Sequence, residues 1–207
     1  MPTHNFQLPR GRIEYLEIDS QALTNNVLGD PTKRTVAIYL PENYDASDEE
    51  YPLLVVIVGF TGSGFGHIAW KAFQETVPQR IDRLVNEGKM GDVVVVLPDC
   101  FTALGGNQYI DSAALGNWGE FLTIEMLSAI ESKYRVKKGR EHRGLFGKSS
   151  GGYGAIIHGM IYSDHWGAVA CHSGDMGFDR CYLPEMPSTL MRFCLLYTSP
   201  SPRDQRG

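Results

Sequence analysis

Two uninterrupted apolar runs, Leu53–Val58 and Val93–Leu97, constrain the fold of this chain most strongly. A strand that is apolar at every position must be covered on both faces, which is typical of the centre of a parallel sheet. Between the two runs, apolar residues recur at helical spacing from Trp70 to Val85. The sequence therefore predicts a strand-helix-strand unit and an α/β fold.

The segments on either side extend this prediction. Residues 12–18 and 34–40 alternate apolar and polar positions, as half-buried antiparallel strands do. Residues 166–172 predict a last buried strand, so the sheet is antiparallel at its start, parallel at its centre and incomplete on its C-terminal side, with this strand at the edge. A further amphipathic helix is predicted by five apolar residues that we expect in the core: Phe121, Ile124, Leu127, Ile130 and Tyr134.

A G-x-S-x-G pentapeptide stands at residues 147–151, between a short apolar run and a glycine-rich segment that predicts a helix to about residue 161. The order strand, serine, helix is typical of a nucleophile elbow, which exposes a serine hydroxyl on a tight turn. Ser149 is therefore the candidate nucleophile. A phosphate-binding loop would need a glycine where His142 stands, so that reading is excluded.

Loops at the carboxyl ends of parallel strands form the usual active-site face of such a sheet. The glycine-rich loop 59–66 follows the first apolar run, so the backbone amides of Phe60 and Ser150 are candidate oxyanion donors. A plain flexible turn is the alternative for this loop, whereas its glycine spacing does not fit a dinucleotide motif. Tyr109 and Trp118 are candidates to line an acyl or alcohol pocket, with packing in the core as the alternative.

A catalytic triad on this architecture runs in the chain order serine, then aspartate or glutamate, then histidine. Three histidines follow Ser149, but none follows Asp175 or Asp179. We expect His158 and His165 to be structural, and a role for His172 or Asp175 would need an unusual order. The sequence therefore predicts that the acid and the histidine are encoded after Phe193, and that the chain as given is inactive or nearly so.

Residues 194–207 continue no periodic pattern, and their back-translation resembles a transposase-type sequencing adapter. We interpret this segment as a non-native read-through tail and residues 1–193 as a truncated hydrolase domain. A natural Ser/Pro-rich disordered tail is the alternative interpretation.

Composition excludes several function classes. The chain has 207 residues and a formal net charge of −5 without a basic stripe, so we expect neither nucleic acid nor an anionic membrane as a partner. No apolar run approaches the roughly 20 residues of a membrane span, and the first residues lack the pattern of a secretory signal, so a cytoplasmic location is expected. The cysteines lack C-x-x-C spacing, so neither a disulfide framework nor a structural zinc site is expected. A serine nucleophile needs no metal or cofactor, and none is expected. The sequence makes no prediction of oligomeric state.

Most of the segment 34–193 resembles the "Putative esterase" family of α/β-hydrolases, which includes enterochelin-esterase-like proteins, esterase D and some feruloyl esterases. The resemblance rests on four segments: 59–62, 106–118, 142–154 and 172–175. It implies a serine esterase that cleaves a small or medium carboxylic ester through an acyl-enzyme, with Ser149 as nucleophile and Phe60 and Ser150 as oxyanion amides. Many relatives have His-Gly where this chain has Val58-Gly59. An acyltransferase or thioesterase using the same serine, and a non-catalytic binding module, remain alternatives.

Overall fold

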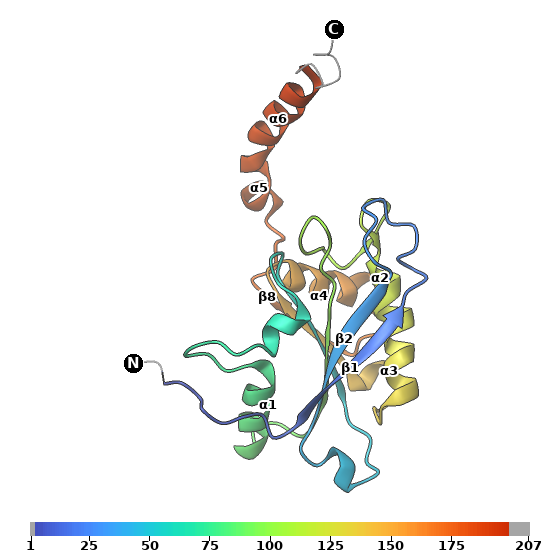
Figure 1. Ribbon diagram of the computed structural model, residues 1–207, viewed down its shortest axis with the longest axis vertical. Helices are drawn as coiled ribbons and strands as arrows, with labels where there is room; N and C mark the ends of the chain where they lie inside the picture. Colours follow the sequence, from blue (N-terminus) through green and yellow to red (C-terminus); the bar gives the residue numbers. More distant parts are fainter. Residues whose placement is uncertain (1–2, 199–207) are drawn as a thin grey trace. The chain divides into compact units, whose positions relative to one another are not determined.

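The computed structural model describes residues 3–198, with side chains described up to residue 192. The chain divides into two units, one ending at Gly174 and one beginning at Asp175. The first unit contains the sheet and the helices that pack on it, and Figure 1 shows its elements in chain order.

A six-stranded mixed sheet organises the first unit, in the order β1-β2-β4-β3-β7-β8. The strands are β1 (Arg12–Asp19), β2 (Lys33–Leu40), β3 (Leu53–Ile57), β4 (Val94–Pro98), β7 (Arg143–Lys148) and β8 (Ala168–His172). Strand β2 pairs antiparallel with β1 and β4, while β3 pairs parallel with β4 and β7, and β7 with β8. The predicted antiparallel start and parallel centre are confirmed.

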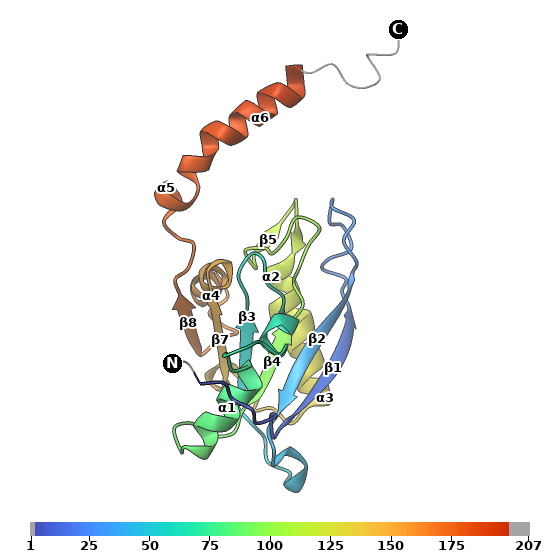
Figure 2. The same cartoon turned by 60° about the vertical axis from the view of Figure 1, so that its left-hand side comes forward.

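Helices cover both faces of this sheet (Figure 2). Helix α1 (Val77–Asn86) packs on one face through Ile81, which belongs to the same buried cluster as Val56 and Val95. On the other face lie α2 (Trp118–Glu120), the π-helical segment η3 (Phe121–Met126), α3 (Leu127–Lys133) and α4 (Ser150–Ile161). Strands β3 and β4 are therefore enclosed, which is why their sequences are apolar at successive positions.

Short elements complete the first unit. They are the 3₁₀ segments η1 (Tyr44–Ala46), η2 (Gly64–His67) and η4 (Arg140–His142), and the two-stranded pair β5 (Asp111–Ser112) and β6 (Gly116–Asn117). In the second unit, α5 (Phe178–Cys181), η5 (Leu183–Glu185) and α6 (Met186–Thr198) follow one another. The interpretation of 194–207 as a tail stays a prediction, because residues 199–207 lie outside the described part of the chain.

The helix predicted from Trp70 begins later than expected. Trp70 is 72% exposed and precedes the helix, as does the exposed Phe73. The start is fixed at Thr76, whose side chain accepts from the Gln79 N–H (3.3 Å) while the Gln79 side chain accepts from the Thr76 N–H (2.9 Å). This reciprocal capping box satisfies N–H groups that a helix start leaves unpaired, so it sets the boundary more strongly than the apolar spacing.

The helix predicted around Phe121 has a different register from the one expected. Phe121, Leu127, Ile130 and Tyr134 are buried as predicted, but Ile124 is 54% exposed, which corrects the expectation. The cause is the π-helical segment η3, whose wider turn shifts the buried face relative to a 3.6-residue period. Two residues outside the predicted stripe take the buried positions instead: Leu122 and Met126.

The last predicted strand is shorter and less buried than expected. Strand β8 begins at Ala168, and Trp166 lies buried just before it. Its residues alternate between exposed and half-buried. Among the described strands, β8 pairs with β7 alone, so it forms the predicted edge, and an edge strand with one open face does not need continuous burial.

Candidate active site

The backbone at Ser149 forms a sharp turn between β7 and α4. Its φ is 58° and its ψ is −123°, a conformation that side-chain-bearing residues rarely adopt. The Ser149 N–H donates to the carbonyl of His172 at the end of β8 (3.0 Å), and its carbonyl accepts from the Tyr153 N–H (2.9 Å). These bonds hold the strained residue between a strand end and the first turn of a helix, where its side chain is half-buried.

The two glycines of the pentapeptide are required by close backbone contacts. A Cβ added to Gly147 would lie 2.5 Å from the carbonyl of Gly151, and one added to Gly151 would lie 2.5 Å from the oxygen of Ile57. Side chains at these positions would push α4 away from β3 and β7. The motif therefore has a steric cause, which is that the helix must start directly against the sheet.

The glycine-rich loop 59–66 lies beside Ser149. A Cβ added to Gly59 would be 3.3 Å from the Ser149 Cβ and 3.8 Å from its Oγ. The Gly62 N–H donates to the Gly59 carbonyl (2.9 Å), which closes a turn over Phe60. The Phe60 side chain is 51% exposed, and Ser150 is buried as the first residue of α4. The structure thus places the turn that contains Phe60 beside Ser149, which is followed by Ser150.

Tyr109 and Trp118 lie elsewhere than at an open pocket, since each side chain is 1% exposed. The Trp118 Nε1–H donates to the Leu115 carbonyl (2.9 Å), and the Arg34 guanidinium lies over its ring at 4.8 Å from the centroid. The Tyr109 hydroxyl is bonded to the backbone of Val58. Both side chains occupy the core, as the alternative interpretation held.

His158 uses both ring nitrogens in the core. Its Nδ1 accepts from the Trp166 Nε1–H (3.1 Å), and because the indole is only a donor, the proton must lie on Nε2, which donates to the Tyr109 carbonyl (2.6 Å). Burial lowers the His158 pKa to about 4, although the bond to Tyr109 opposes this. A histidine held in this way has no nitrogen left to take a proton from Ser149, in agreement with a structural role.

Sequence reasoning did not find the contacts that hold the 59–66 loop. Ser63 donates through Oγ to Asp99 Oδ1 (3.0 Å), which also accepts from the Phe101 N–H (3.3 Å). Asp99 follows β4, and its place at a carboxyl strand end was the available signal.

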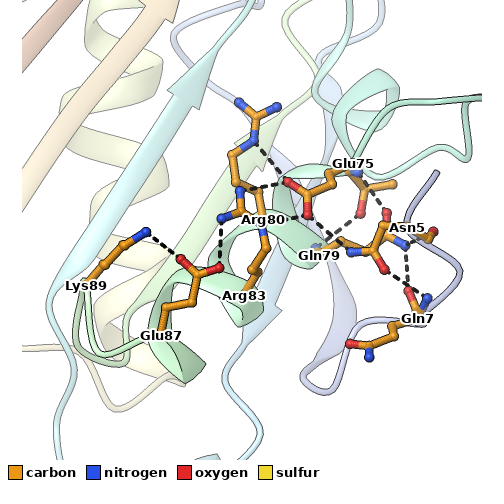
Figure 3. Close-up of polar contacts among 9 residues, drawn as sticks. Asn5, Gln7, Glu75, Gln79, Arg80, Arg83, Glu87 and Lys89 are labelled. Atoms are coloured by element: carbon orange, nitrogen blue, oxygen red, sulfur yellow. Dashed lines mark hydrogen bonds and ion pairs between the residues drawn. The ribbon is translucent and has the colours of Figure 1, made fainter. Parts of the chain in front are cut away.

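One cavity in the described part of the chain is lined by none of these residues. It has a volume of about 870 Å³, and its lining residues all lie within 3–10 or 73–87. Its wall is polar: Glu75 accepts from Asn5 (3.2 Å) and from Arg83 (2.8 Å), as Figure 3 shows.

Within the described residues, no three His, Cys, Asp or Glu side chains are grouped to hold a metal ion. No helix of the described chain is long and apolar enough to cross a membrane.

A mixed sheet that is parallel at its centre, with a strained serine between a strand and a helix, defines an α/β-hydrolase fold. The model of the family described as "Putative esterase" matches residues 29–177, and the chain belongs to this family.

Known proteins agree with this placement. "Esterase Rv1288" of Mycobacterium tuberculosis is 27% identical over 148 residues, which are 70% of this chain and 30% of that protein. A solved ferulic acid esterase is 27% identical with a TM-score of 0.60, over 78% of this chain and 58% of its own. The fold is also that of a ferulic acid esterase from the anaerobic fungus Anaeromyces mucronatus, which is 19% identical with a TM-score of 0.65, over 86% of this chain and 64% of its own. The chain thus spans less than two thirds of the length of each.

Proposed function

We propose that this chain carries the nucleophile and the oxyanion donors of a serine esterase that acts on a small or medium carboxylic ester. The observation that carries the proposal is the strained turn at Ser149 with the Gly59 backbone packed against it. Membership of an esterase family and the similarity to ferulic acid esterases support ester hydrolysis as the reaction.

In the proposed reaction, the Ser149 Oγ attacks the ester carbonyl carbon and its proton passes to a general base. Negative charge on the carbonyl oxygen is stabilised by the backbone amides of Phe60 and Ser150, the second of which begins α4 and adds the positive end of the helix dipole. The base then donates this proton to the leaving oxygen as the C–O bond breaks, so that the alcohol departs, and water hydrolyses the acyl-enzyme.

We infer that the general base and its acid partner come from sequence that follows Phe193 in a longer protein. The chain order of the fold needs a histidine after the acid, but no histidine of this chain follows Asp175 or Asp179. His158 is in addition occupied in the core. The same inference treats residues 194–207 as a non-native tail. A long DNA read across the Phe193 codon tests it: a frame that continues into an acidic residue and then a histidine supports it, and a frame that encodes residues 194–207 refutes it.

Two serine variants test the function. In the longer protein, Ser149→Ala abolishes turnover of a p-nitrophenyl ester and labelling by a fluorophosphonate. Ser132→Ala removes an exposed hydroxyl on α3 and leaves both unchanged. Turnover that survives Ser149→Ala refutes the proposal, and product analysis with competing alcohol or thiol acceptors separates an esterase from an acyltransferase.

A further inference from the structure

The Tyr109 hydroxyl forms two hydrogen bonds with Val58, the residue that precedes the glycine-rich loop 59–66, and is the first anchor of this loop. The Tyr109 OH donates to the Val58 carbonyl (2.6 Å) and accepts from the Val58 N–H (2.8 Å). Val58 follows the last residue of β3 and precedes Gly59, whose backbone packs on Ser149. Since backbone groups here have no neighbouring strand to pair with beyond Ile57, the hydroxyl takes the place of a sheet partner.

Tyr109 is itself held from several sides. Its φ is 63°, in the left-handed region, and its N–H donates to the Asn107 side chain (2.6 Å), which in turn donates to the Cys100 carbonyl (2.6 Å). Its carbonyl accepts from His158 on α4, and His158 accepts from Trp166. A buried series of hydrogen bonds therefore runs from the helix that starts at the elbow to the strand end before the loop.

The far end of the loop has a second anchor. Ser63 donates to Asp99, and the Ser63 oxygen also accepts from the Phe65 N–H (3.4 Å) at the start of η2. Between the two anchors, the Phe60 carbonyl accepts from the Gly106 N–H (2.5 Å). Because the Phe60 carbonyl is held by this hydrogen bond, the backbone at Phe60 has a restricted orientation.

We propose that Tyr109 and Asp99 are positioning residues that hold the Phe60 amide in place for the oxyanion. They act through the backbone of Val58 and through Ser63, without touching the substrate. This rests on the proposed function, because it assumes that the Phe60 amide is an oxyanion donor. A donor that moves by about 1 Å loses much of its effect on the transition state, which corresponds to roughly a hundredfold in rate.

The test compares Tyr109→Phe with Tyr162→Phe. The first removes the hydroxyl on Val58 and keeps the ring. The second removes a hydroxyl that donates to Asp111 (2.9 Å), on a ring that also contacts His158 (4.6 Å between centroids), so it is a matched control outside the loop. In the longer protein, Tyr109→Phe is expected to lower kcat about tenfold to a hundredfold with KM within about twofold, and Tyr162→Phe to change neither. Ser63→Ala releases the second anchor and is expected to lower kcat in the same way.

Hydrogen exchange followed by mass spectrometry measures the mobility of the loop backbone independently of catalytic activity. Tyr109→Phe should accelerate exchange in the peptide that covers 58–66 and leave the β1–β2 peptides unchanged. An unaltered kcat in a folded Tyr109→Phe variant, or an equal loss in Tyr162→Phe, overturns the proposal. If Tyr109→Phe does not fold, Ser63→Ala decides by the same kcat and exchange measurements. Because exchange does not depend on turnover, it tests the positioning proposal separately from the esterase function. The esterase function itself is refuted by activity that survives Ser149→Ala.

Discussion

Replacing His158 by glutamine is expected to change how stability depends on pH. A glutamine ends in an NH2 group that donates and a carbonyl oxygen that accepts, so it is able to replace both ring nitrogens toward Tyr109 and Trp166, but it does not titrate. In the wild-type chain, the buried imidazole must stay neutral to accept from Trp166. The folded state therefore resists protonation at this site.

The magnitude follows from the His158 pKa, which burial lowers from 6.5 to about 4. Between these values the unfolded chain binds a proton that the folded chain does not, so the free energy of unfolding rises with pH. The contribution is present in full above about pH 6.5 and is lost as pH falls toward 4. The difference between a pKa of 6.5 and one of about 4 corresponds to roughly 3 kcal/mol.

Urea unfolding, followed by tryptophan fluorescence at pH 7, 6 and 5, measures this directly. Other titrating groups contribute to both chains, so the difference between wild type and His158→Gln isolates the histidine. We expect the unfolding free energy of wild type to fall, relative to that of His158→Gln, by about 1 kcal/mol for each unit of pH below 6.5. Two stability curves that stay parallel from pH 7 to pH 5 would refute the assignment of a neutral, doubly bonded imidazole.

Two further predictions concern packing. Gly151→Ala places a Cβ 2.5 Å from the Ile57 oxygen and is expected to lower the unfolding free energy by about 1–3 kcal/mol, whereas Gly91→Ala meets no atom within 4 Å and serves as its control; equal midpoints in urea would contradict the steric account of the elbow. Leu122→Ala is expected to lower the unfolding free energy by about 2–5 kcal/mol, and Ile124→Ala by less than about 0.5 kcal/mol. The reverse order would indicate a regular helical register and contradict the shift that we assign to η3.

The centre of the fold could be predicted from the sequence because the patterns that determine it lie within short segments of the chain. The runs that form β3 and β4 and the glycines around Ser149 each encode their own constraint, which is two-sided burial in one case and close backbone approach in the other. The elbow helix ends at Ile161, as predicted. The roles of Ser149, Phe60 and Ser150 remain predictions, although the structure brings the three together.

The misplaced features depend on partners that are distant in sequence. Trp70 and Phe73 fit a helical period, but their rings gather around His4 of the N-terminal segment, at 5.5 and 6.1 Å between centroids. Tyr109 suits a pocket or a core equally well until its contact with Val58, 51 residues away, is known. Neither pairing leaves a periodic trace, so only the tertiary structure distinguishes the alternatives.

The central claim is that Ser149 forms the covalent intermediate. The most direct measurement is to quench the longer protein in acid during turnover of a p-nitrophenyl ester and to locate the acyl group by peptide mass spectrometry. The account predicts the acyl mass on the peptide that contains Ser149, and its loss in Ser149→Ala with Ser132→Ala unaffected. An acyl group on another residue, or turnover that survives Ser149→Ala, would contradict it.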